Sequence, residues 1–216
     1  GTLNANATRT VANAITLGGN AAVGGTQSLT FAGTLTQSLG NRTLTVSNTG
    51  GTTLADINLS ESGTDRTLTI NNTGAVTVSG IIANGGGSTA SGLTKSGNGI
   101  LTLASANTYA GNTTITAGTL TLGDDSALGT GTLALNGGTL NANAPRTVAN
   151  AITLGGNTAI GGTQSITFSD TLTQSLGNRT LTVSNTGGTT LADINLSESG
   201  TDRTLTISNT GAVTVT

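Results

Sequence analysis

The sequence lacks most of the side chains on which protein chemistry depends. It contains no cysteine, histidine, methionine or tryptophan, and a single proline. Without cysteine there is no disulfide and no thiolate metal site, and without histidine the commonest general base is missing. Charged residues make up 7% of the chain and the net charge is −2, so the basic surface that a nucleic-acid partner needs is absent. No apolar run approaches the length of a membrane-spanning helix.

The chain is also poor in hydrophobic side chains, which account for 34% of residues, with aromatics at 1%. Low hydrophobicity often signals disorder, but disorder normally also requires a high net charge. Here Leu, Ile and Val recur at regular places among Thr, Asn, Ser and 34 glycines. This composition favours ordered β-structure with a thin core.

What the sequence does contain is a long internal duplication. Residues 1–79 recur as 138–216, an offset of 137, with 71 of 79 positions identical. The eight differences are Thr8/Pro145, Ala21/Thr158, Val23/Ile160, Leu29/Ile166, Ala32/Ser169, Gly33/Asp170, Asn71/Ser208 and Ser79/Thr216. The repeat predicts one continuous segment over 1–216, with a full module in 1–137 and a partial second copy in 138–216. Because both ends fall inside the repeat, we expect the chain to belong to a longer protein.

Short runs of alternating Thr and Leu dominate the module, as at 43–46, 67–70 and 119–122. Period-two alternation is typical of strands that bury one face. Gly and Asn clusters between the runs suit sharp corners. A stack of coils can absorb a repeated module, whereas a closed sandwich or barrel cannot. The sequence therefore predicts an all-β solenoid of three strands per coil, with about five coils of ~27 residues per module.

A shorter repeat relates residues 42–50 to residues 66–74. Stacking these stretches as successive coils gives three pairs: Leu44 with Leu68, Val46 with Ile70, and Asn48 with Asn72. The apolar pairs are expected inside and the asparagines at a corner. The asparagines could form an amide ladder along the axis or simply belong to turns, and the sequence leaves both open.

One stretch carries a more specific motif, in residues 92–103 and 106–122. Leu101 and Leu103 are expected to point inward, and Lys95 to lie in a Gly-rich turn. Tyr109 is expected to plug a corner with its hydroxyl reaching water. The alternative, Tyr109 as a stacking platform for a sugar, is weak because a lone aromatic makes a poor platform.

These residues resemble the passenger-associated repeat of bacterial autotransporters, in which an LTKxGxGxLTL run is followed by NTYxGxTTIxxGTLxL. The resemblance implies a right-handed parallel β-helix (solenoid) that is extracellular, at the bacterial cell surface. It also implies an outer-membrane barrel in the parent protein, which is not in this chain. The function that follows is the stalk or scaffold of a large surface adhesin.

Catalysis finds little support in the sequence. Asp56 and Glu61 could form the carboxylate pair of a polysaccharide-active enzyme. Their duplication as Asp193 and Glu198 argues against a site, since an enzyme rarely needs the same pair in every module. Asp124 and Asp125 could bind Ca²⁺, but the calcium-binding glycine repeat is missing and a solvated turn suits them better. We expect no catalytic, cofactor-binding or metal site.

Two further alternatives concern surfaces. Thr-x-Thr recurs at residues 34–36, 43–45, 67–69 and 119–121, and outward threonines could form an ice- or glycan-binding face. Thr is also simply a good polar strand former, which explains the pattern without a ligand. Open strand edges at the ends of a solenoid could also join modules into an extracellular filament. The partners expected are therefore neighbouring copies of the same repeat, including a homo-oligomer or filament, with no nucleic acid and no small-molecule substrate.

Overall fold

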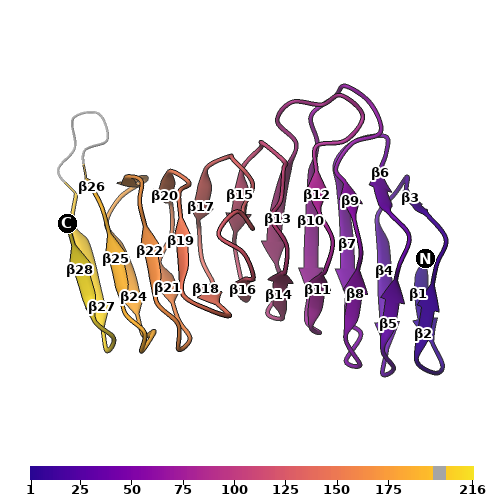
Figure 1. The fold of residues 1–216 in the computed structure, drawn as a ribbon, viewed down its shortest axis with the longest axis horizontal. Helices are drawn as coiled ribbons and strands as arrows, with labels where there is room; N and C mark the ends of the chain where they lie inside the picture. The colour runs from indigo at the N-terminus through magenta and orange to yellow at the C-terminus, as the bar shows by residue number, and fades with distance from the viewer. Residues whose placement is uncertain (197–202) are drawn as a thin grey trace.

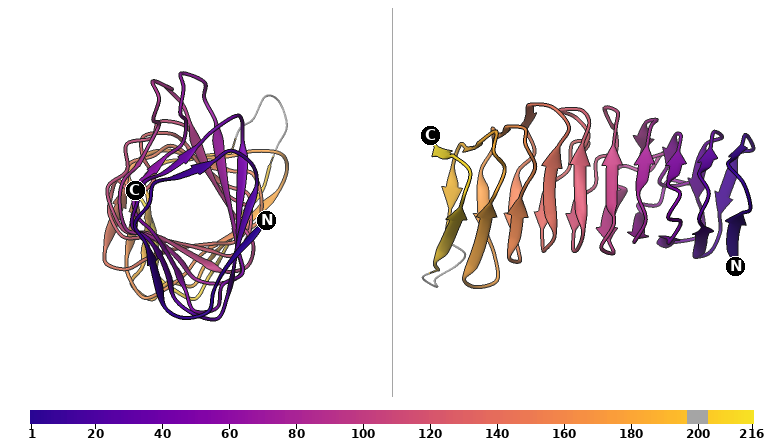
Figure 2. Two further views of the ribbon diagram at one scale, coloured as in Figure 1. Left: turned by 90° about the vertical axis from the view of Figure 1, so that its right-hand side faces the viewer. Right: turned by 90° about the horizontal axis from the view of Figure 1, so that it is seen from below.

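The chain winds into a β-solenoid whose coils follow one another along a single axis, with the two termini at opposite ends (Figure 1, Figure 2). A computed structural model describes residues 1–196 and 203–216. All strand pairings in these ranges are parallel, as between β1 (Thr2–Ala5) and β4 (Ala21–Gly25). Among the same residues, no helix is long and apolar enough to cross a membrane.

Three faces surround the axis, and two of them are sheets of ten strands in the described residues. The first face consists, in order, of β1, β4, β7 (Arg42–Val46), β10 (Thr67–Asn72), β13 (Gly92–Ser96), β15 (Thr113–Ile115), β17 (Leu133–Leu135), β20 (Ile152–Leu154), β23 (Leu172–Gln174) and β26 (Ile194–Asn195). The second face consists of β2 (Arg9–Val11), β5 (Leu29–Phe31), β8 (Thr52–Leu54), β11 (Val76–Val78), β14 (Ile100–Leu103), β16 (Thr119–Leu122), β18 (Thr139–Ala142), β21 (Thr158–Ile160), β24 (Arg179–Val183) and β27 (Leu205–Asn209).

The third face is split into two four-stranded sheets. The first sheet contains β3 (Ile15–Leu17), β6 (Leu35–Gln37), β9 (Ile57–Asn58) and β12 (Ile82–Ala83). The second contains β19 (Arg146–Val148), β22 (Ile166–Phe168), β25 (Thr189–Leu191) and β28 (Val213–Val215). Between them, the coils that start with β13 and β15 have loops in place of a third strand.

Alternation along each strand creates the core. In β10, Leu68, Ile70 and Asn72 are buried, while Thr67 and Thr69 are half-buried on the outside. Successive side chains of a strand point to opposite faces, so each coil contributes its Leu, Ile or Val side chains to one apolar column. The all-β solenoid predicted from the alternation is confirmed.

The coils vary in length and are shorter on average than the sequence suggested. Leu133 pairs with Ile152 across a short coil, whereas Arg42 pairs with Leu68 across a long one. The module in residues 1–137 therefore contains just over six coils rather than about five. Loops of different length at the corners absorb the variation, as in the long loops above β9 and β12 (Figure 1).

The predicted stacking of residues 42–50 on 66–74 is wrong by two positions. Ile70 pairs with Leu44, and Asn72 pairs with Val46. This coil is longer than the sequence repeat because a corner follows β9, in which the Ser60 hydroxyl donates to carbonyl oxygens of the same corner. A shift of two preserves the side-chain parity of a strand. The predicted inward residues are consequently still buried, although their neighbours differ.

The differences between the two copies fall where the alternation predicts. Val23 and Ile160 are both buried, as are Leu29 and Ile166, so these exchanges conserve apolar bulk inside the core. The exchanges Thr8/Pro145 and Gly33/Asp170 lie between strands. The exchanges inside the core thus conserve its packing, whereas the corner at Gly33 differs locally, since a Cβ there would lie 2.2 Å from the Asn13 carbonyl oxygen.

Close coil-to-coil contact at the corners makes Gly74→Ala destabilising. A Cβ at Gly74 would lie 2.0 Å from the Asn48 carbonyl oxygen, and backbone cannot move aside cheaply. Overpacking of this kind costs about 1–3 kcal/mol. The unfolding midpoint in urea should fall for Gly74→Ala. The matched control is Gly19→Ala, because no atom lies within 4 Å of that Cβ. Equal midpoints for the two variants would contradict the tight stacking.

Candidate functional site

The segment over residues 92–131 builds two coils that lack a strand on the third face, and the Asn107 side chain fills the gap. Its Oδ1 accepts a hydrogen bond from the Ile82 amide at 2.7 Å. Its Nδ2 donates to the Ala127 carbonyl at 2.6 Å. Asn107 therefore joins the coil before it to the coil after it, as ladder hydrogen bonds do elsewhere.

Tyr109 lies next to this bridge and is fully buried. Its hydroxyl hydrogen-bonds with the Thr113 hydroxyl, and burial raises the pKa of Tyr109 well above its ordinary value. Tyr109 thus fills the interior of the coil, but the expectation that its hydroxyl reaches water is wrong. A ring with no exposed surface offers no platform for a sugar.

Leu101 and Leu103 point inward from β14 and are fully buried, as predicted. They pair with Leu120 and Leu122 of the next coil, which are equally buried.

Lys95 departs from its expected place in a turn. It belongs to β13, in register between Ile70 and Ile115, and its side chain is fully buried. The ammonium donates to the carbonyl oxygens of Ser96 at 2.8 Å, Gly97 at 2.7 Å and Ala117 at 3.2 Å. Burial lowers the pKa of Lys95 from 10.5 to about 8. Lys95 therefore satisfies carbonyl groups of two stacked corners, one in its own coil and one in the next. The inward position could have been predicted from the strand alternation, because Lys95 is two residues after the apolar Leu93.

Asn48 and Asn72 are both fully buried at corners. Asn48 Nδ2 donates to the Gly51 carbonyl at 2.9 Å, within its own turn. Asn72 Nδ2 donates to the carbonyl oxygens of Gly74 at 2.7 Å and Ile100 at 2.8 Å. Because Asn72 pairs with Val46 in the ladder, the two asparagines are out of register for an amide ladder. Asn48 and Asn72 therefore each belong to a turn, as in the second of the two interpretations.

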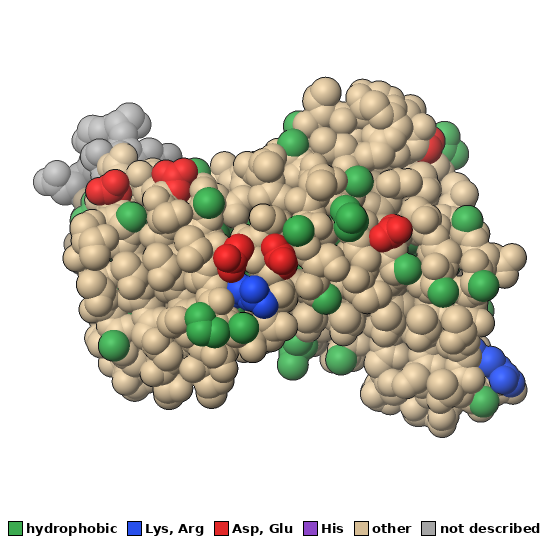
Figure 3. Space-filling model, in the orientation of Figure 1, with side chains coloured by type: hydrophobic (Ala, Val, Ile, Leu, Met, Phe, Trp, Pro, Cys, Tyr) green, Lys and Arg blue, Asp and Glu red, His purple; other side chains and the backbone are tan. Residues whose placement is uncertain are grey.

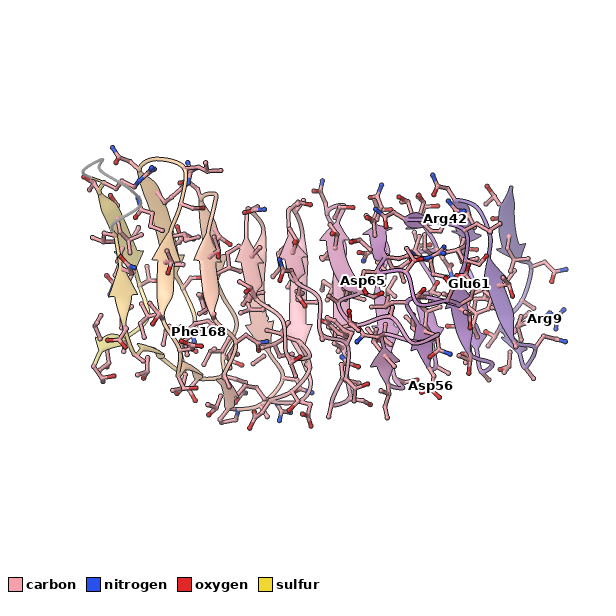
Figure 4. The ribbon with its side chains drawn as sticks, turned by 90° about the horizontal axis from the view of Figure 1, so that it is seen from above. Arg9, Arg42, Asp56, Glu61, Asp65 and Phe168 are labelled. Atoms are coloured by element: carbon pink, nitrogen blue, oxygen red, sulfur yellow. The ribbon has the colours of Figure 1, made fainter. Side chains whose placement is uncertain are left out.

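The two acidic residues considered for catalysis, Asp56 and Glu61, bind backbone amides instead, and Asp65 does the same. Asp56 accepts from the Ile81 amide at 2.8 Å, and Asp65 from the amides of Thr89 and Ala90 at 2.8 and 2.7 Å. Glu61 accepts from the Leu39 amide at 3.0 Å, and this hydrogen bond is the main cause that lowers the pKa of Glu61. Figure 4 labels all three acids on the N-terminal half of the solenoid. Of the predicted copies, Glu198 lies outside the described residues and Asp193 follows β25; Asp202, which is the copy of Asp65, also lies outside the described residues.

Asp124 and Asp125 lie in a turn, in agreement with the simpler interpretation. Asp124 Oδ1 accepts from the Ser126 amide at 2.8 Å, and Asp125 lies 3.8 Å from the Arg146 guanidinium. Within residues 1–196 and 203–216, no three acids gather as a metal site. Charged side chains are few on the face shown in Figure 3, where acidic and basic side chains lie together near the middle.

Outward threonines form single rows along the axis, and the Thr-x-Thr pairs do not stack into a double row. The Thr-x-Thr pairs that the sequence suggested fall on different faces, as Thr36 on the third and Thr43 on the first. On the second face, one threonine per coil aligns through six consecutive strands: Thr10, Thr30, Thr53, Thr77, Thr102 and Thr121. The row ends at Asn141. This is the longest row of identical outward side chains that the strand pairings define.

A feature that sequence reasoning missed is an exposed leucine in a strained corner. Leu39 has φ of 57° and is 75% exposed, and its copy Leu176 has φ of 58° and is 72% exposed. A bulky residue seldom adopts this left-handed conformation. The buried Gln37 side chain donates to the Gly40 carbonyl at 3.0 Å and to the Thr67 carbonyl at 3.3 Å, which holds the corner. The glycine that follows each leucine was the available signal of a tight turn.

Comparison with known proteins agrees with this geometry. Residues 93–122 match the family model of the passenger-associated-transport-repeat, and this stretch is therefore similar to the repeats of autotransporter passengers. The chain is also 49% identical over 67 residues to the adhesin BmaC autotransporter of Brucella suis biovar 1 (strain 1330). That alignment covers 30% of this chain and 2% of the relative's length. No solved structure matches the chain.

The buried ammonium of Lys95 makes stability depend on pH. In the unfolded chain the pKa takes its ordinary value of 10.5, whereas in the folded chain it is about 8. Between these values the unfolded state binds more protons, so the free energy of unfolding should rise as the pH rises above about 8. Below that pH both states are protonated and the slope vanishes. Thermal unfolding followed from pH 7 to 10 measures the effect.

Lys95→Met is the control, because Lys95 is the only lysine in the sequence. The variant should lose the rise in unfolding temperature between pH 8 and 10. The comparison stops near pH 10 because the raised pKa of Tyr109 then acts in the opposite direction. Parallel pH profiles for the two proteins would show that Lys95 does not titrate as described.

Proposed function

We propose that this chain is a structural segment of the passenger of an autotransporter-type surface adhesin, exported to the bacterial cell surface and serving as stalk or scaffold. The observation that carries the proposal is the unbroken stack of coils, which runs through the passenger repeat and into the duplicated module. Such a stack grows along one axis as modules are added. At ~4.8 Å per coil, ten coils give a rod of roughly 45 Å.

The interior of the solenoid supports a mechanical role. Its polar side chains (Lys95, Asn107 and Asn72) donate to backbone carbonyl oxygens of their own or neighbouring coils. These bonds hold the coils together where strands are missing or corners are tight. The adhesive activity named for the relative would then reside in other parts of a parent protein.

The hydrogen bonds of the Asp56 and Glu61 carboxylates agree with a non-catalytic role. A hydrolytic pair needs one carboxyl group free to give a proton and the other to attack or activate water. Asp56 and Glu61 instead accept hydrogen bonds from backbone amides, and the hydrogen bond from the Leu39 amide lowers the pKa of Glu61, which favours its ionised form. Their part is to fasten corners.

Small-angle X-ray scattering of chains with one, two and three added modules tests the stalk. The maximum dimension should grow linearly, by roughly 30 Å per module, while the cross-section stays constant. The same proteins should show no saturable binding on a glycan array. A globular scattering profile, or saturable ligand binding by the 216-residue chain itself, would contradict the stalk role.

The aligned threonines support a second candidate, an ice- or glycan-binding surface. Six hydroxyl and methyl groups repeat at the coil spacing along the second face, which is the regularity that a periodic ligand recognises. Thr53→Lys with Thr77→Lys should then abolish thermal hysteresis or polysaccharide pull-down. The matched control is the pair Thr153→Lys with Thr173→Lys, on the first face. Absence of both activities in the unmodified chain would eliminate this candidate.

A further inference from the structure

The two copies of the module do not occupy the same faces. β1 lies on the first face, and its copy β18 lies on the second. β2 and its copy β19 lie on the second and third faces, and β3 and its copy β20 on the third and first. The shift is the same throughout the duplicated part. β27 is the copy of β10 and β28 is the copy of β11, and each copy lies one face further around the axis.

The shift arises because the module is not a whole number of coils. β1 is the first strand of the first face, and β18 is the seventh strand of the second face. The module therefore covers six coils and one additional face. From this geometry we infer that consecutive modules join through one fixed interface, and that each join turns the module surface by one face, about a third of a turn.

The interface can be described at the internal joint, where β16 meets β18. Leu120 pairs with Leu140, and Leu140 is fully buried. Its copy Leu3, on the open N-terminal end, is 48% exposed. There an apolar hollow of about 110 Å³ is lined by Leu3, Ile15, Leu17 and other core residues. Because Leu3 is the copy of Leu140, a copy of the β16 coil that covers Leu140 would cover Leu3 in the same way.

Polar side chains of the internal joint also have copies at the N-terminal end. Arg146 donates to the Gly123 carbonyl and to Asn143 Oδ1, and Asn150 Nδ2 donates to the carbonyl oxygens of Gly129 at 3.0 Å and Gly131 at 2.7 Å. The copy of Arg146 is Arg9, which makes only the local contact, to Asn6 Oδ1 at 3.3 Å. The copy of Asn150 is Asn13, which is exposed.

A copy of residues 119–137 placed before Gly1 would therefore meet Leu3, Arg9 and Asn13 as residues 119–137 meet their copies in the internal joint. The apolar, guanidinium and amide residues of the internal joint recur here at the same positions of the module, so the partner is this chain's own module rather than an unrelated protein. Strand addition to an open edge supplies the backbone hydrogen bonds of the joint.

The rotation has a consequence for display, and here the inference rests on the proposed stalk. The exposed Leu39 precedes a first-face strand, whereas Leu176 precedes a second-face strand. In a tandem array the same corner would point in three directions in turn and return to the first after three modules, roughly 90 Å along the axis. A stalk so built offers each module's surface on every side. It also prevents parallel stalks from aligning identical faces along their length.

Spin-label distances test the rotation in the 216-residue chain. Thr43 and Thr173 lie in register on the first face, six coils apart, whereas the copy of Thr43 is Thr180, on the second face. Because the chain lacks cysteine, the pairs Thr43→Cys with Thr173→Cys and Thr43→Cys with Thr180→Cys can be labelled cleanly. The first pair should give the shorter distance, roughly 29 Å between the backbones. A shorter distance for the second pair would overturn the rotation.

The joint is tested by placing a second copy of residues 80–137 in front of Gly1. Amide exchange over Thr2–Ala5 should then slow by about tenfold or more, to approach that of Thr139–Ala142. The control carries Leu120→Asp in the added copy alone, and should restore fast exchange at the new joint while the internal joint stays protected. Fast exchange in the extended chain, or an extended chain that fails to fold, would overturn the joint. Neither experiment depends on adhesion, so a stalk that proves to bind ligand would refute the proposed function and leave this inference standing.

Discussion

The structure depends on backbone hydrogen bonds that run from each coil to the next in parallel register. A parallel strand cannot satisfy its amides within its own coil, so each coil depends on the adjacent coils for its backbone hydrogen bonds. The corners obey the same constraint. Where a strand is missing, Asn107 supplies the hydrogen bonds from its side chain, and where a corner leaves carbonyl oxygens inside, Lys95 donates to them. The composition follows from this demand: Thr on the wet face, Leu inside, and Gly where backbones of adjacent coils touch.

The fold class could be predicted because alternation is a local property. Each Thr-Leu-Thr-Leu run fixes which side chains are buried, and the long repeat excludes closed architectures. Leu44, Leu68, Leu101 and Leu103 are accordingly buried as expected. Register could not be predicted, since the length of a coil depends on loops whose conformations are set by contacts with adjacent coils. The corner after β9 lengthens one coil and displaces the Asn48 and Asn72 pairing by two positions.

The interior polar residues show the other limit of sequence reasoning. The predictions placed Lys95 in a turn and the Tyr109 hydroxyl in water, because charged and hydroxyl groups usually remain solvated. In a thin solenoid the interior lies close to the corners, so a long side chain can be buried along its length and still reach carbonyl groups at the end. Alternation alone put Lys95 on the same side as Leu93, and this local signal was more reliable than the polarity of the residue.

The central claim is that strands pair with those one coil away and that the second copy of the module lies one face further around. Nuclear Overhauser effects in the isotopically labelled chain measure this pairing directly. We expect backbone contacts from Leu140 to Leu120 on one side and to Ile160 on the other, as in a continuous second face. Contacts that instead join residues 139–142 to 133–135 as an antiparallel hairpin would contradict the solenoid and, with it, the stalk.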